Sequence, residues 1–193
     1  MIVRLNFVEE KRLAAQQLWL APLIWLPAED YSSEWFKEFR NQVEQVSNHK
    51  LSSPEALKNL VKFGEAEFKR VVDHRDWGDP LNFERIKTAL ELQVSAVLCH
   101  RQWVESLDPD LMEQWPCWEV VSRGNNTPMD QRRLDWELAG GKLFQGRMIA
   151  TKWDAVWKAF SFAQLPHPPF NIEHDVDVED VELAEAVQLG VLS

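Results

Sequence analysis

Helix start signals recur along this chain, and they constrain its fold more than any other feature. At four places a short polar side chain stands directly before proline, at Ser53, Asp79, Asp108 and Thr127. Such a side chain accepts hydrogen bonds from N–H groups of the first helical turn, where proline has no N–H to lose. A chain with so many starts of this kind is expected to be mainly helical.

Apolar side chains repeat at helical spacing in register with these signals. Residues 33–47 place Trp35, Phe39 and Val43 on one face, and the stretch after Ser53 continues the same pattern. The longest helix is expected over residues 81–107. Helices are therefore predicted over 8–21, 33–47, from 53 onward, 81–107, a short turn from 108, 128–139, a segment that carries Trp153, Val156, Trp157 and Phe160, and about 181–189.

The pattern changes after Pro116, where short runs of β-branched and aromatic residues begin. Residues 118–121 predict a strand, and residues 142–150 predict a hairpin that turns at Gln145 and Gly146. The expected fold class is α+β, predominantly α-helical, with a small antiparallel sheet in the C-terminal half. Three regions are predicted: a helical region over 1–76, a long helix with a mixed α+β domain over 77–165, and an acidic, proline-led tail over 166–193.

Charge and cysteine content exclude several classes of protein. The net charge is −10, and no Lys or Arg follows residue 158, which argues against binding nucleic acid through phosphate contacts. Cys99 and Cys117 lie in apolar patterns and are predicted to be reduced thiols. The most apolar run, residues 18–26, is too short to cross a bilayer. We expect a cytoplasmic or particle-associated protein without membrane contact.

The densest polar cluster in the sequence lies in the tail and contains His167, His174, Asp175 and Asp177. Oxygen-rich spacing of this kind can hold a hard cation. Acids that alternate with valines also describe a strand with one solvated face, and we favour that interpretation. The sequence therefore predicts no cofactor and no tightly bound transition metal.

Ten tryptophans supply more aromatic surface than one small core usually takes up. Most lie at helical spacing and are expected in the core. Those that flank prolines are candidate anchors for a protein partner. These candidates are Trp19, Trp25, Trp115 and Trp118.

Signatures of common enzymes are missing from the sequence. It has no Gly-rich phosphate loop, no nucleophile elbow and no metal-binding pair of histidines. His49, His74 and His100 have no neighbour suited to form a catalytic triad. An enzyme is therefore the less favoured class.

The order of motifs over residues 81–170 resembles the head-morphogenesis domain of tailed-phage minor head proteins. After Pro169 the chain departs from the family pattern, because Phe170 and Asn171 replace a cysteine-rich stretch. Gln131 or Arg132 stands where the family has a histidine. The residues that carry the resemblance are Arg85, Thr88, Glu91, Leu92, the strand 118–122, Leu134, Asp135, Gly140, Gly141, Gly146, residues 154–157, Pro166, His167, Pro168 and Pro169.

The resemblance implies a portal-associated structural protein of a capsid. The leading hypothesis is therefore a non-enzymatic structural or assembly protein of a phage or prophage-derived particle, which binds other protein subunits such as portal or capsid components, or its own copies. One alternative is a small transferase or hydrolase that uses the cluster near Asp175. Another is an acidic binding or inhibitory module that mimics nucleic acid.

Overall fold

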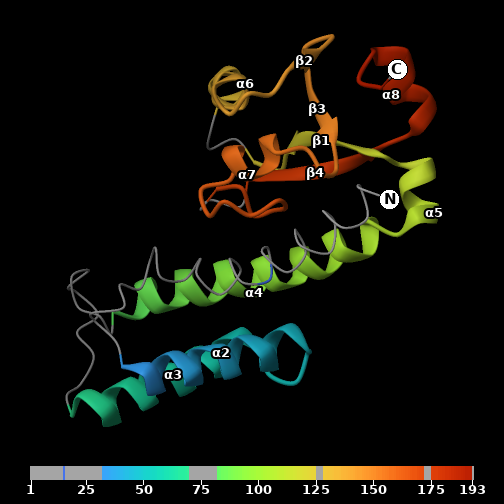
Figure 1. Ribbon diagram of the computed structural model, residues 1–193. Coiled ribbons are helices and arrows are strands. Elements are labelled where there is room, and N and C mark those ends of the chain that lie inside the picture. Colours follow the sequence, from blue (N-terminus) through green and yellow to red (C-terminus); the bar gives the residue numbers. More distant parts are fainter. Residues whose placement is uncertain (1–14, 16–31, 70–81, 125–127, 172–174, 193) are drawn as a thin grey trace. The chain divides into compact units, whose positions relative to one another are not determined.

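A computed structural model describes residues 15, 32–69, 82–124, 128–171 and 175–192 (Figure 1). The described residues are mainly helical and include a small antiparallel sheet, which confirms the predicted fold class. Apart from Ala15, which is helical, the predicted helix over 8–21 lies outside these ranges, and so does the start signal at Asp79. Within them, no helix is both long enough and apolar enough to cross a membrane.

The chain divides into two compact units. The first unit is Leu18–Leu98, and the second unit is Met1–Gln17 together with Cys99–Ser193. The boundary falls inside α4 (Phe83–Ser106), so this helix contributes to both units. The predicted divisions after residues 76 and 165 differ from this arrangement. The tail belongs to the same unit as the α+β region because its residues pair with the sheet and pack in its core.

Helices α2 (Ser33–Ser47) and α3 (Ser53–Phe68) pack against each other in the first unit. Asn59 Nδ2 donates a hydrogen bond of 3.2 Å to Gln42 Oε1 across their contact. The cap of α3 is Ser52 rather than the predicted Ser53, since Ser52 and Glu55 bond each other's backbone N–H groups in a capping box. The α2 bounds agree with the sequence prediction.

The sheet has the strand order β2–β3–β1–β4. The central strand β1 pairs antiparallel with β3 on one side and with β4 on the other. Gln145 and Gly146 connect β2 to β3 with φ angles of 53° and 82°, the positive values that a type I′ turn requires. The strands and remaining helices of this unit are β1 (Cys117–Ser122), β2 (Leu143–Phe144), β3 (Arg147–Thr151), β4 (Val176–Val181), α5 (Pro109–Gln114), α6 (Met129–Leu138), α7 (Val156–Phe160) and α8 (Leu183–Leu189).

Tryptophans form much of the core beside this sheet. Trp103, Trp118, Trp136 and Trp157 belong to one buried cluster, in which the rings of Trp136 and Trp157 meet edge to face at 5.0 Å. Gly141 is required here, because a Cβ at this position would lie 2.2 Å from Trp136 Nε1. Four of the ten tryptophans are thus taken up by this one core.

The tail packs on its own unit, as its apolar helix face predicted. Val181 and Ala186 join Cys117 and Ile149 in a second buried cluster. Leu189, Val191 and Leu192 pack against this cluster. The acidic segment is the edge strand β4, which confirms the strand interpretation of its alternating acids and valines.

Candidate functional site

His167 is fully buried, and both of its ring nitrogens are occupied. Its Nδ1 lies 2.7 Å from the carbonyl oxygen of Pro168, and its Nε2 lies 3.1 Å from Nδ1 of His100. A carbonyl oxygen only accepts, so Nδ1 of His167 carries the proton and Nε2 accepts from His100. Burial lowers the pKa of His167 to about 3, and it lowers the pKa of His100 as well. His167 is therefore neutral at physiological pH and has no free lone pair for acid–base chemistry.

Asp175 lies in a buried ion pair with Arg132, and each side chain is only 3% exposed. Asn171 Nδ2 donates to the other carboxylate oxygen, and the backbone N–H of Arg123 donates to the Asp175 carbonyl at 2.8 Å. Gly124 also lies close to Asp175, because a Cβ added at Gly124 would be only 3.1 Å from Cβ of Asp175. These contacts fix the chain as it enters β4, and they use the carboxylate for structure.

Asp177 faces a different cation. Its carboxylate accepts from Arg123 Nε at 3.2 Å and from the backbone N–H of Val178 at 2.9 Å. The three described residues of the predicted cluster each have a different partner: His167 pairs with His100, Asp175 with Arg132 and Asp177 with Arg123. His174 lies outside the described residues. In the described part of the chain, no group of three metal-ligating side chains occurs.

Lys152 is a buried cation that sequence reasoning missed. It is 1% exposed, and its Nζ lies 2.6 Å from Oδ1 of Asp180. The same oxygen accepts from Trp118 Nε1 at 3.1 Å, and the ammonium lies 5.7 Å from the centre of the Trp118 ring. Trp118 is only 6% exposed. Its interpretation as a partner anchor is wrong, because β1 is the central strand and turns this side chain into the core.

Arg147 on β3 joins two further acids. Its guanidinium donates to Glu119 on β1 and, at 2.6 Å, to Glu185 on α8. Hydrogen bonds to these carboxylates raise the pKa of Arg147. This bridge holds α8 to the sheet and, with the pairs above, neutralises much of the acidity of the tail.

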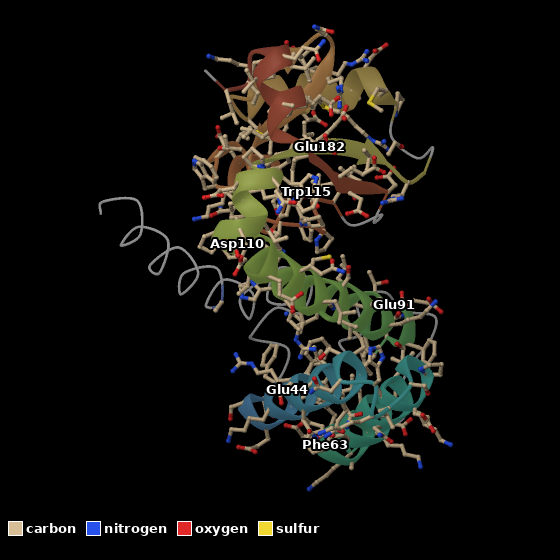
Figure 2. All side chains as sticks on the ribbon, turned by 90° about the vertical axis from the view of Figure 1, so that its right-hand side faces the viewer. Glu44, Phe63, Glu91, Asp110, Trp115 and Glu182 are labelled. Carbon is tan, nitrogen blue, oxygen red and sulfur yellow. The ribbon has the colours of Figure 1, made fainter. Side chains whose placement is uncertain are left out.

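Of the other candidate anchors and histidines, Trp115 and His49 are described, and they belong to different units. Trp115 is half-buried at the C-terminal end of α5 (Figure 2). His49 is exposed after α2. Trp19, Trp25 and His74 lie outside the described residues.

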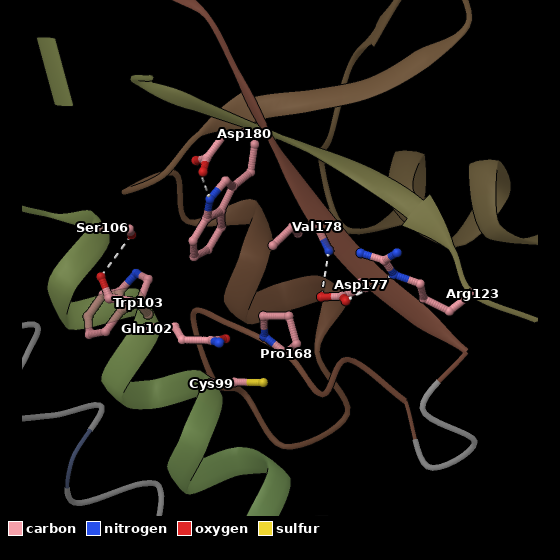
Figure 3. A pocket seen from close by; sticks show the side chains of 10 residues that line it. Cys99, Gln102, Trp103, Ser106, Arg123, Pro168, Asp177, Val178 and Asp180 are labelled. Atoms are coloured by element: carbon pink, nitrogen blue, oxygen red, sulfur yellow. Dashed lines mark hydrogen bonds and ion pairs between the residues drawn. The ribbon is translucent and has the colours of Figure 1, made fainter. Parts of the chain in front are cut away.

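A cavity of about 330 Å³ lies within the second unit, beside the C-terminal part of α4 and the edge strand β4 (Figure 3). No sequence motif marked it, because its walls come from segments far apart in the chain. Its lining residues are Cys99, Gln102, Trp103, Ser106, Trp118, Arg123, Pro168, Asp177, Val178 and Asp180.

Comparison with known proteins adds no relative to these observations. The chain matches no protein-family model, no curated protein and no solved structure.

Proposed function

We propose that this chain is a non-enzymatic assembly protein of a phage or prophage-derived particle and acts through contacts with other protein subunits. The observation that carries the proposal is the internal pairing of the polar cluster: His167 with His100, Asp175 with Arg132 and Asp177 with Arg123. A catalytic acid or base must reach the reacting group with a proton or a lone pair. Side chains already held in this way support a structural role over the small-enzyme alternative.

The elements that carry the resemblance to minor head proteins also support this role. The expected strand lies within β1, and the expected helix α6 ends just before Gly140 and Gly141. The β2–β3 hairpin follows with Gly146 in its turn. Sequence order and local structure thus agree through this stretch.

Pairing within the tail disfavours an acidic module that mimics nucleic acid. Arg123 lies 3.2 Å from Asp177 and 3.9 Å from Glu179, and Lys152 pairs with Asp180. A mimic of phosphates needs free negative charge at its surface. These acids carry their counter-charges within the same unit.

Exposed apolar side chains on α6 support protein contacts. Leu134 is 48% exposed and Leu138, one turn later, is 77% exposed. Single exposed leucines are ordinary, but two on one helix face give a small apolar surface. Portal subunits, capsid subunits and further copies of this chain are the partner classes that the proposal names.

Sedimentation of a lysate from cells that produce the native particle tests the proposal. The chain, detected by antibody, is expected in particle-sized fractions and should remain there after nuclease treatment, which removes tethering by nucleic acid. Presence in the slowly sedimenting fractions alone would contradict the assembly role.

A pair of variants on α6 examines the same proposal at residue level. Leu138→Glu should lower recovery with particles while leaving the melting temperature nearly unchanged, because surface substitutions change stability by about 0.5 kcal/mol or less. Gln131→Glu adds the same charge at another exposed position of the helix and serves as the control. Equal recovery of both variants with particles would show that Leu138 on α6 does not contribute to the contact.

A further inference from the structure

We propose that the free edge of β4 binds an extended segment of a partner protein in which basic and apolar side chains alternate. This inference does not depend on the assembly role, and it rests on the backbone and the charges of β4. An edge strand presents unpaired N–H and C=O groups with which an extended chain can pair. In the described sheet β4 is one edge strand, and the other, β2, has only 2 residues.

The hydrogen bonds beside β1 show which backbone groups of β4 face outward. The N–H of Arg123 donates to the carbonyl of Asp175 at 2.8 Å, and these two residues continue the register of β1 and β4. In an antiparallel pair, alternate residues point their N–H and C=O groups toward the partner strand and away from it. The odd-numbered residues of β4 therefore bond β1, and the even-numbered residues face the free edge. The outward-facing residues are Val176, Val178 and Asp180.

The backbone N–H of Val178 already has an acceptor on the outer side of the strand. It donates to Oδ1 of Asp177 at 2.9 Å (Figure 3), which agrees with its outward direction. The carboxylate oxygen stands where a carbonyl oxygen of an added strand would accept. If an added strand displaced Oδ1, Asp177 would keep its bond of 3.2 Å from Arg123, because that bond uses Oδ2. Val178 is half-buried and Asp180 is exposed, so this part of the edge can be reached.

The cavity beside α4 and β4 gives room for a side chain of the added strand. Val178 and Asp180 line it from the strand, and Gln102 and Ser106 line it from α4. A residue placed directly opposite Val178 would have its side chain on the same face of the sheet. That side chain would enter the cavity, whose volume is about 330 Å³. An apolar side chain suits the position, because Trp118 forms part of the wall and Val178 packs against the core.

The other face of β4 carries more negative than positive charge. Asp177 and Glu179 lie 3.2 and 3.9 Å from Arg123, so one guanidinium serves two carboxylates. Glu119 stands opposite Glu179 on β1, and it shares Arg147 with an acid of α8. A Lys or Arg opposite Asp177 or Glu179 would add a favourable cross-strand pair. The added strand should therefore be basic on this face and apolar on the other.

A second copy of β4 fits this edge poorly. If two β4 strands paired antiparallel around Val178, Asp177 of each strand would lie opposite Glu179 of the other. Like charges directly opposite each other destabilise a sheet. The charge pattern therefore favours a different chain that carries Lys or Arg at alternate positions.

Titration with a short peptide tests the proposal. The probe is acetyl-Thr-Lys-Val-Lys-Val-Thr-amide, which in antiparallel pairing places a valine opposite Val178 and lysines opposite Asp177 and Glu179. It is added to the ¹⁵N-labelled full chain, and the backbone amide signals are followed by NMR. Binding should saturate with a dissociation constant of about 0.1–1 mM, as expected for a short flexible peptide. The amide signals of Val178 and Asp180 should shift most.

Three altered peptides separate backbone pairing from charge. N-methylation of the valines removes N–H groups that would face β4, and it should weaken binding at least about tenfold. N-methylation of the lysines changes N–H groups that point away from β4, and it should change the dissociation constant by less than about threefold. Glutamate in place of the lysines should weaken binding at least about threefold, because it places acids opposite acids.

A variant of the protein blocks the same edge. Val178→Pro removes the outward N–H and no bond between β1 and β4, a position at which an edge strand tolerates proline. Val178→Thr keeps the N–H and is the matched control. The proline variant should lose peptide binding, and the threonine variant should keep it. Should Val178→Pro fail to fold, the methylated peptides decide.

Several results would overturn the proposal. They are the absence of a saturable shift on β4, equal weakening by the two methylation patterns, and undiminished binding of the glutamate peptide or of a folded Val178→Pro chain. Self-association of the chain that Val178→Pro abolishes would make a second copy the occupant of the edge and would also overturn it.

Discussion

Replacement of Asp175 by asparagine tests how the sheet is joined to the segments around it. The substitution keeps the side-chain shape and removes the charge that balances Arg132. Both partners are 3% exposed, so the guanidinium would remain buried without a counter-charge. Breaking a buried pair from one side costs about 3–5 kcal/mol.

The expected loss lies near the lower end of this range. An asparagine oxygen can still accept from Arg132, and the backbone bond from Arg123 to the residue-175 carbonyl is unaffected. In a unit of this size, about 3 kcal/mol corresponds to a fall in melting temperature of more than about 10 °C.

Asp177→Asn, two residues further along and within β4, is a matched control. Asp177 pairs with Arg123, but the two side chains are 41% and 56% exposed, so the loss should be at most about 1 kcal/mol. Urea unfolding followed by tryptophan fluorescence measures both variants. Equal losses for the two variants, or a loss below about 1 kcal/mol for Asp175→Asn, would refute the reasoning about burial.

Three further predictions concern the same unit. Burial lowers the pKa of His167 from 6.5 to about 3, so as the pH falls the unfolded state binds a proton before the folded state does. The contribution of the neutral, buried His167 to the free energy of unfolding is therefore complete above pH 6.5 and is lost as the pH falls toward 3. The free energy of unfolding in urea should therefore fall with decreasing pH across that range, and this pH dependence should be weaker in His167→Gln. An unchanged pH dependence in the variant would contradict the role given to His167. Burial raises the pKa of Cys117 to about 11, so iodoacetamide should label Cys99 first and both thiols only after unfolding; equal native rates by mass spectrometry would argue otherwise. Truncation after Glu182 uncovers the cluster around Ala186 and should lower the free energy of unfolding by about 2–4 kcal/mol in urea, whereas unchanged stability would mean that α8 contributes nothing.

Local signals in the sequence were sufficient for most helices and strands. The bounds of α2 follow from an apolar stripe, and β4 follows from acids that alternate with valines. The cap of α3 was misplaced by one residue because Ser52 and Ser53 carry the same signal. Neighbouring residues determine these features, so a single sequence reveals them.

The site could not be predicted in the same way, because its partners are distant in sequence. Arg132 and Asp175 are 43 positions apart, and Trp118 and Asp180 are 62 apart. The tail contains no Lys or Arg, so the sequence alone predicts that its acidic side chains have no nearby counter-charge. Their counter-charges come from α6, from β3 and from the residues that follow β1 and β3, and only the folded arrangement of these segments brings them together.

The copy number of this chain in purified particles tests the assembly proposal most directly. Quantitative mass spectrometry would measure its ratio to the main shell protein before and after a wash at about 1 M salt, which screens weak ionic contacts. The account predicts a ratio that is constant between preparations and survives the wash. A ratio that falls toward zero as the particles are purified would contradict it.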